Sequence, residues 1–231
     1  MNQNPRPPAA INPLPPVVIA LAVVIFGIEM LFTLGSSGSF MGDGGLGWRQ
    51  YALENYAFYA MAVDWMLENS RFPPDLLIRF VTYPLLHLSL MHAVFVCVFI
   101  LAMGKMVGEA FGNISVLIVF WGASIGGALV YGLVSSESFP LVGGFPGVYG
   151  LIGGFTFIMW VRQRALGQSQ MQAFRLIGIL LLVQLLFGVV LGGRNDWIAD
   201  VAGFVTGFGL SFMLVPGGWA QLREQLRRMR R

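Results

Sequence analysis

The sequence predicts an all-α integral membrane protein, a bundle of six transmembrane helices with one long loop on its outer side. Of its 231 residues, 56% are hydrophobic and 11% are charged, and the mean hydropathy is +0.73. Soluble domains carry about 25% charged residues. The apolar residues gather in six runs without lysine or arginine, most of them near the roughly 20 residues with which a helix crosses a bilayer. These runs lack the alternation of β-barrel strands, so only helices would satisfy their backbones in lipid.

Three parts follow one another along the chain. Residues 1–16 are rich in proline, which predicts an extended or disordered tail. The run Val17–Leu34 is longer than the apolar core of a signal peptide, which has about 7–15 residues. The residues before it contain a single basic side chain, Arg6, so we expect a retained first helix. Residues 17–216 form the predicted membrane domain, and residues 217–231 form a basic cytoplasmic tail.

The longest segment without a span runs from Gly35 to about Arg79. Its second half has apolar residues at near-helical spacing with acids between them, which predicts amphipathic helix at the outer membrane interface. The aromatic residues that could anchor it there are Trp48, Tyr51, Tyr56, Tyr59 and Trp65. The five later spans are predicted at Phe80–Met103, Ile114–Val134, Leu141–Val161, Leu176–Leu191 and Trp197–Val215.

Basic residues near helix ends predict the orientation. With both termini on the inner side, ten of the 14 lysines and arginines fall inside and four outside. We therefore expect a multi-pass cell-membrane protein, in a bacterial inner membrane, with both termini in the cytoplasm. The arginines of residues 217–231 would lie near anionic lipid headgroups or serve as a topology anchor. This asymmetry, rather than a nucleic-acid partner, explains the isoelectric point near 9.4.

Polar side chains are few in the second run. Ser89, His92 and Val96 share one helical face, at i, i+3 and i+7, whereas His87 is predicted to face the outer interface. Cys97 is the single cysteine and lies among apolar residues. The sequence therefore predicts neither a disulfide framework nor a thiolate metal site, and we expect no cofactor.

Three motifs together resemble the family of rhomboid intramembrane serine proteases. They are the H-x-x-x-x-H spacing in HLSLMH (residues 87–92), the glycine-rich turn in VGGFPGVYGLIGG (residues 142–154), and ADVAGFVTG (residues 199–207) in the last run. The Trp48-Arg49 pair in the long outer loop extends the resemblance to most of the chain. The resemblance implies a rhomboid-like bundle of six helices with an L1-type outer loop.

The same resemblance places the family's catalytic residues on positions that are substituted here. The nucleophilic serine falls at Phe145, the catalytic histidine at Asp200, and the oxyanion-stabilising asparagine at Val96. Of the residues that the family uses around the scissile carbonyl, His92 is retained.

Elementary chemistry agrees with an inactive site. A serine protease needs an oxygen nucleophile, a base and donors for the oxyanion, and losing either the nucleophile or the base costs about 10⁶ in rate. Phe145 has no lone pair, Val96 has no N–H, and the Asp200 carboxylate is a poor base for a hydroxyl. An active enzyme would need another nucleophile, for which the candidates are Ser89, Ser124 and Thr206.

Two carboxylates lie within the spans, where an acid costs about 2.5–3.5 kcal/mol and by default has a partner or a role. If the rhomboid arrangement holds, Asp200 lies close to His92, and we expect the pair to latch two helices; sensing of a ligand or proton is the alternative. Two ligands are too few for a metal site. Asp200 also shares a face with Gly203 and Gly207, a spacing that permits close helix contact. Glu29 is expected to bind a hydroxyl of the bundle or line a wet cavity.

The sequence leaves three functions open. The favoured one is a pseudoprotease that binds transmembrane segments of client proteins without cutting them, as the resemblance implies through a lateral opening between the second and fifth helices. The second is an active intramembrane serine protease with a different nucleophile. The third is a channel or transporter with Glu29, His92 and Asp200 as its polar path, although no broken helices or paired repeats are visible.

Overall fold

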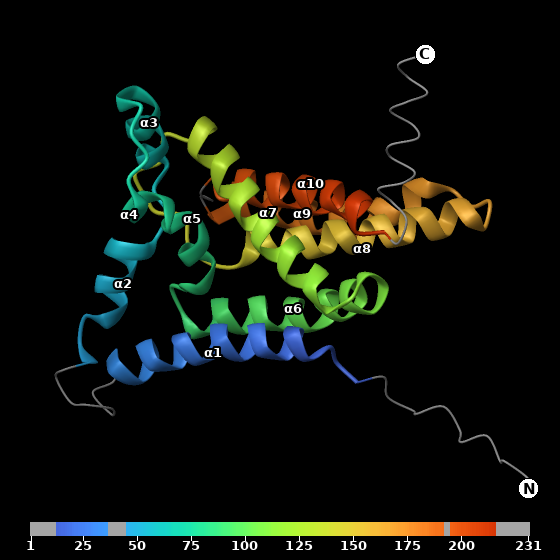
Figure 1. Ribbon diagram of the computed structural model, residues 1–231, viewed down its shortest axis with the longest axis horizontal. Coiled ribbons are helices and arrows are strands. Elements are labelled where there is room, and N and C mark those ends of the chain that lie inside the picture. The colour runs from blue at the N-terminus through green and yellow to red at the C-terminus, as the bar shows by residue number, and fades with distance from the viewer. Residues whose placement is uncertain (1–12, 37–44, 192–194, 216–231) are drawn as a thin grey trace, which may run out of the picture.

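The computed structural model describes residues 13–36, 45–191 and 195–215. The basic tail 217–231, with its expected headgroup contacts, and most of the 1–16 tail lie outside the described residues. In chain order, the elements are α1 Pro16–Ser36, α2 Trp48–Tyr56, α3 Ala60–Asn69, α4 Pro74–Leu77, α5 Arg79–Thr82, the 3₁₀ helix η2 Tyr83–Leu85, α6 Leu90–Phe111, α7 Asn113–Val134, α8 Phe145–Ala165, the 3₁₀ helix η3 Gln170–Phe174, α9 Arg175–Leu191 and α10 Trp197–Leu214 (Figure 1). The predicted all-helical class is confirmed for this part of the chain, in which one isolated bridge joins Phe58 and Leu141.

Four described helices are long and apolar enough to cross a membrane, namely α1, α6, α7 and α10. The structure therefore supports a multi-pass membrane protein. Two further predicted spans correspond to α8, which has 21 residues, and α9, which has 17. Helix α8 packs against α6, α7 and α10. Because protein rather than lipid surrounds it, α8 can hold glycine, proline and tyrosine and need not be as apolar as the outer helices.

The second span begins ten residues later than the sequence predicted. The run Phe80–Met103 was expected to be helical throughout, but its first ten residues form the end of α5, η2 and a loop. Pro84 lies in η2, and Ser89 caps α6 by accepting a hydrogen bond from the N–H of His92 at 3.3 Å. Tyr83 is fully buried, so the apolar character of this stretch reflects burial inside the protein.

The long outer segment is divided into short helices instead of one amphipathic helix. Helices α2 and α3 are separated at Ala57, where the backbone is extended, and after α3 the chain begins α4 at Pro73 and Pro74. Of the predicted aromatic anchors, Tyr51, Tyr56 and Trp65 are exposed, and Trp48 and Tyr59 are half-buried. Helix α3 packs against α7, which fixes this segment over one end of the bundle (Figure 1).

The closest helix contact in the core is between α8 and α10. Gly207 lies directly on the backbone of Gly150, and Gly203 lies on Pro146, so that a Cβ at either α10 glycine would overlap with α8 backbone atoms. The predicted close contact of this α10 face is confirmed. Because the two backbones approach so closely, the first turns of α8 and α10 are held at one end of the bundle.

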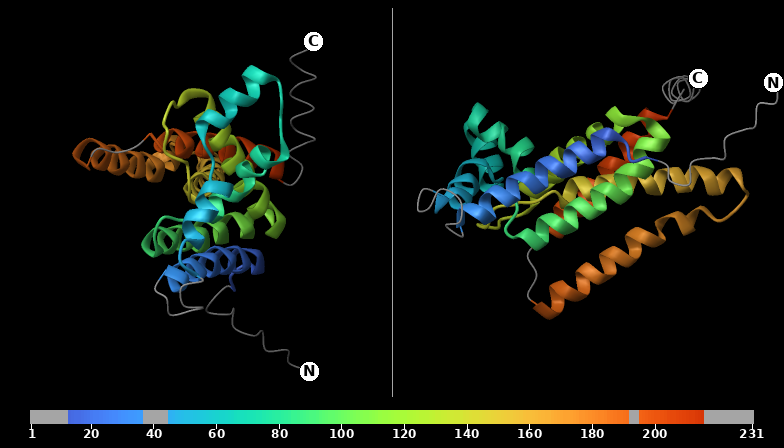
Figure 2. Two further views of the ribbon diagram at one scale, coloured as in Figure 1. Left: turned by 90° about the vertical axis from the view of Figure 1, so that its left-hand side faces the viewer. Right: turned by 90° about the horizontal axis from the view of Figure 1, so that it is seen from below.

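Helix α9 lies at the edge of the bundle. Figure 2 shows it in orange, set apart from α8 in the right-hand view after the connection through η3. Its inner face carries Ile177, which is buried, and Leu180, which packs against the core. The opposite side exposes Ile179 and Leu182. One face of α9 therefore borders the interior, and the other is open to the surroundings.

Candidate functional site

The glycine-rich turn before α8 presents Phe145 as the first residue of the helix. Gly143 has φ +99°, a left-handed conformation that glycine adopts without strain. The N–H of Gly143 donates to the carbonyl of Tyr83 at 3.1 Å, and the N–H of Gly144 donates to Nε2 of His87 at 3.4 Å. Pro146 follows in the first turn of α8, where its fixed φ suits the helix.

The glycines of this turn make room for two side chains of α6. A Cβ at Gly143 would lie 2.5 Å from Cε1 of His92, and a Cβ at Gly144 would lie 2.8 Å from Cγ1 of Val96. Any larger residue would push the turn away from α6. The structure thus places Phe145, His92 and Val96 around one turn, as the sequence motifs implied.

The ring of Phe145 occupies the place beside His92. Their centroids are 5.2 Å apart and their planes differ by 17°, which is a stacked arrangement. The Phe145 side chain is half-buried and packs against the main core. The phenyl ring of Phe145 has no lone pair that can attack a carbonyl, so this side chain cannot act as a nucleophile beside His92.

His87 is the site residue that the sequence placed wrongly. It was predicted to face the outer interface from a helix, but it precedes α6 and is 1% exposed. Its ring stands edge-on to His92, with centroids 4.9 Å apart. Burial, followed by the charge of His92, lowers the pKa of His87 to about 3. His87 is therefore neutral at physiological pH and can accept the hydrogen bond from Gly144.

Asp200 binds Gln184 instead of His92. Nε2 of Gln184 donates to Oδ2 of Asp200 at 2.7 Å, and the hydroxyl of Tyr149 donates to Oε1 of Gln184 at 3.1 Å. In place of the expected pairing with His92, Asp200 has this chain of hydrogen bonds, and the ring that stacks on His92 is that of Phe145. The motifs did not point to Gln184, although it is the single polar residue of the apolar run Leu176–Leu191.

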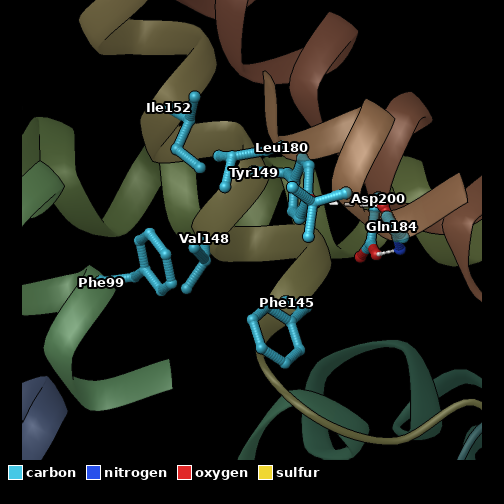
Figure 3. A pocket seen from close by; sticks show the side chains of 9 residues that line it. Phe99, Phe145, Val148, Tyr149, Ile152, Leu180, Gln184 and Asp200 are labelled. Carbon is cyan, nitrogen blue, oxygen red and sulfur yellow. Dashed lines mark hydrogen bonds between the residues drawn. The ribbon is translucent and has the colours of Figure 1, made fainter. Parts of the chain in front are cut away.

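A cavity of about 210 Å³ lies between α6, α8, α9 and α10. Figure 3 shows the Asp200–Gln184 hydrogen bond on one side of it and the Phe145 ring on another. The remaining wall is apolar, with contributions from Phe99 of α6 and Leu180 of α9. Phe145 and Asp200, which the sequence singled out separately, therefore border the same space.

The hydroxyl groups considered as alternative nucleophiles all bond to their own helix. Oγ of Ser124 donates to the carbonyl of Phe120 at 2.8 Å, and Oγ1 of Thr206 donates to the carbonyl of Ala202 at 2.8 Å. Ser89 is the N-cap of α6. These are the hydrogen bonds that serine and threonine commonly make in helices.

Glu29 lies away from the cavity and has its own cation. The carboxylate is fully buried in α1 and accepts hydrogen bonds from Arg49, at 2.8 Å to Oε1 and 3.1 Å to Oε2, and from the hydroxyl of Thr33 at 3.1 Å. Arg49 also donates to the carbonyl of His87 at 2.6 Å. The predicted hydroxyl partner is confirmed. The sequence did not predict the ion pair of Glu29 with Arg49.

The comparison with protein families identifies the bundle. The family model of the rhomboid domain matches residues 74–217, which include the turn before α8, the histidines that precede and open α6, and the α10 motif. No curated protein matches the chain. The match covers more than half of the sequence, and the residues within it form the site described above. The chain belongs to the rhomboid family.

Proposed function

We propose that this rhomboid-family protein is a pseudoprotease, which binds transmembrane segments of other membrane proteins and does not cleave them. The observation that carries the proposal is the stacking of Phe145 on His92 at 5.2 Å. By the family resemblance, the nucleophilic oxygen of an active member belongs where this ring lies. An aromatic side chain blocks the approach of a carbonyl and supplies no lone pair.

The other positions around the turn support the same conclusion. Val96, at the position of the oxyanion-stabilising asparagine, is fully buried and has no donor. Asp200, at the position of the catalytic histidine, is engaged with Gln184. The hydroxyls of Ser124 and Thr206 bond to helix carbonyls, which argues against a replacement nucleophile. Glu29 is bound by Arg49, which weighs against its use in an ion path.

The apolar cavity beside Phe145 supports the binding of transmembrane helices. The cavity is lined mainly by apolar side chains and is bordered by α6 and α9, the second and fifth helices of the expected bundle. Helix α9 lies at the edge of the fold. The family resemblance implies a lateral opening there, through which a client helix would enter beside α9. In lipid, packing and polar contacts decide which helices associate.

The proposal includes a topology. We infer six spans, with α8 and α9 in addition to the four long apolar helices, and both termini on the cytoplasmic side of a bacterial inner membrane. The excess of lysine and arginine on the inner side supports this orientation. In it, the basic tail 217–231 meets anionic headgroups, and the first turn of α10 lies near the outer surface.

The proposal is tested with purified protein in detergent and in lipid nanodiscs. We expect neither labelling by a fluorophosphonate probe nor cleavage of a rhomboid-type transmembrane substrate, while an active rhomboid protease in parallel does both. We expect a photo-crosslinker at Leu180, on the inner face of α9, to capture a labelled transmembrane peptide, and one at the exposed Ile179 to capture little. Cleavage, or equal capture at both positions, would contradict the proposal.

A further inference from the structure

The two buried acids of the membrane domain, Glu29 and Asp200, differ in whether a basic side chain of the described residues pairs with them. Glu29 is paired with Arg49 at 2.8 Å, so its charge is balanced within the protein. Asp200 is 5% exposed, and within the described residues no lysine or arginine lies within ion-pair distance of it. An acid in a span without a cation is costly, and such residues are typically paired or functional. Within the described residues, Asp200 therefore lacks the cation that Glu29 has.

The hydrogen bonds of Asp200 leave capacity for such a group. A carboxylate offers about four acceptor sites, and the amide of Gln184 fills one of them, at Oδ2. The donating amide of Gln184 is itself oriented, because its Oε1 accepts from the hydroxyl of Tyr149. Tyr149 and Gln184 thus hold the carboxylate in place without neutralising it. Asp196, one turn earlier at the N-cap of α10, adds a second acid at this end of the helix.

Asp200 borders the cavity, and the volume of the cavity limits which groups can enter. Sites for drug-sized ligands measure about 300–1,000 Å³, whereas this cavity measures about 210 Å³. A single long side chain fits the smaller space better than a cofactor does. The apolar walls, such as Phe99 and Leu180, suit the methylene stem of a lysine, and Asp200 suits its ammonium group. The cavity also lies between α6 and α9, where the proposed client helix would stand.

We propose that Asp200 selects client transmembrane helices that carry a basic side chain about one helical turn below their outer end. The inference rests on the proposed function and specifies which clients it applies to. The register follows from the position of Asp200 in the first turn of α10, roughly 5 Å along the helix axis from its beginning. The ammonium group of the client donates to acceptor sites of the carboxylate that Gln184 leaves open, and it balances the charge of the carboxylate.

The test uses the full-length protein in phosphatidylcholine nanodiscs and a model peptide, a fluorescent leucine-alanine transmembrane helix. Three versions carry lysine, methionine or glutamate one turn from the outer end, and binding is measured by energy transfer. We expect the lysine peptide to bind about tenfold more tightly than the methionine peptide, the size of an interhelical polar contact in lipid. The glutamate peptide is expected to bind least. Lipid without net charge removes the electrostatic attraction of the lysine peptide to anionic headgroups.

Two variants of the protein locate the preference. Asp200→Asn keeps an acceptor for Gln184 and is expected to bind the lysine and methionine peptides within about twofold of each other. Asp64→Asn removes an acid from the exposed face of α3 and is expected to keep the full preference. Thermal unfolding of each variant shows whether its fold is intact. A lysine preference that survives Asp200→Asn would overturn the inference.

A measurement on the unmodified protein gives an independent answer. A membrane-permeant carbodiimide joins a carboxylate to a neighbouring amine as an amide, and the reagent takes up the lost water as a urea. With the lysine peptide bound, mass spectrometry is expected to find the crosslink at Asp200. Crosslinks confined to exposed acids such as Asp64 would overturn the inference. Equal binding of the lysine and methionine peptides would refute the selection of cations but leave helix binding intact, whereas binding of no peptide would refute the proposed function as well.

Discussion

The ring of Phe145 lies nearly parallel to that of His92, with 17° between their planes and 5.2 Å between their centroids. In an active member of the family, by the resemblance, a serine hydroxyl would occupy this position. Here, the two rings stack at the turn before α8, and Phe145 packs against the core of the fold.

Replacing Phe145 tests both its packing and the proposed absence of catalysis. Phe145→Ala is expected to lower the free energy of unfolding by about 2 kcal/mol, less than the 3–5 kcal/mol of a fully buried phenylalanine because this ring is half-buried. Phe145→Ser returns a hydroxyl but neither a base nor an oxyanion donor, so we expect no cleavage of a transmembrane substrate. Thermal unfolding in detergent and a fluorophosphonate assay measure the two effects. Cleavage by Phe145→Ser would show that the rest of the machinery is present.

The crowding at Gly143 is separable from its backbone conformation. Gly143→Ala is expected to destabilise the protein strongly, because its Cβ would meet the His92 ring at 2.5 Å and its φ is positive. Gly167→Ala is the matched control, since Gly167 also has positive φ, +66°, but has no atom within 4 Å of the added Cβ. The control is expected to cost about 1 kcal/mol, and Gly143→Ala clearly more. Equal shifts in unfolding temperature would mean that the turn does not lie against His92.

The ion pair between Arg49 and Glu29 predicts a non-additive cycle. Arg49→Gln leaves a buried carboxylate without its cation and is expected to cost about 3–5 kcal/mol. Glu29→Gln removes the charge but keeps a hydrogen-bonding partner for Arg49, so we expect a smaller loss. The double variant should lose clearly less than the sum of the two single losses. Denaturation in detergent measures all three, and simple additivity would contradict the contact.

His87 predicts a pH dependence with a definite sign. Its pKa is about 3 in the folded protein and near 6.5 when unfolded, so between these values the unfolded chain binds more protons. The contribution of His87 to stability is then complete above about pH 6.5 and is lost as the pH is lowered toward 3, by at most about 1.4 kcal/mol per pH unit. His87→Gln is expected to flatten this part of the profile, which unfolding curves at several pH values would detect. An unchanged profile would show that His87 is accessible to protons in the folded state.

The sequence predicted the helical class and several spans well because lipid imposes a uniform demand on them. Val17–Leu34 and Ile114–Val134 correspond closely to α1 and α7, whose outer faces must be apolar along their whole length. The same reasoning failed at Phe80, where apolar residues around Tyr83 are buried by protein instead of lipid. Hydropathy alone does not distinguish the two environments.

The sequence motifs indicated that Phe145, His92 and Val96 lie together, but they did not indicate the polar contacts around them. The motifs brought Phe145, His92 and Val96 to one turn, since a family match fixes their relative positions. The partner of Asp200 could not be derived in this way, because it depends on which way Gln184 of α9 turns and on the space that the Phe145 ring takes. A lone glutamine in an apolar run is the signal that could have indicated it.

The separation along the chain between each buried acid and its partner has a consequence for biogenesis. Glu29 and Arg49 are 20 residues apart, and Gln184 and Asp200 are 16 residues apart. Each bond therefore joins segments that leave the ribosome one directly after the other. A nascent hairpin can make its own bond before any distant helix has been synthesised, so that neither acid has to enter the lipid unaccompanied.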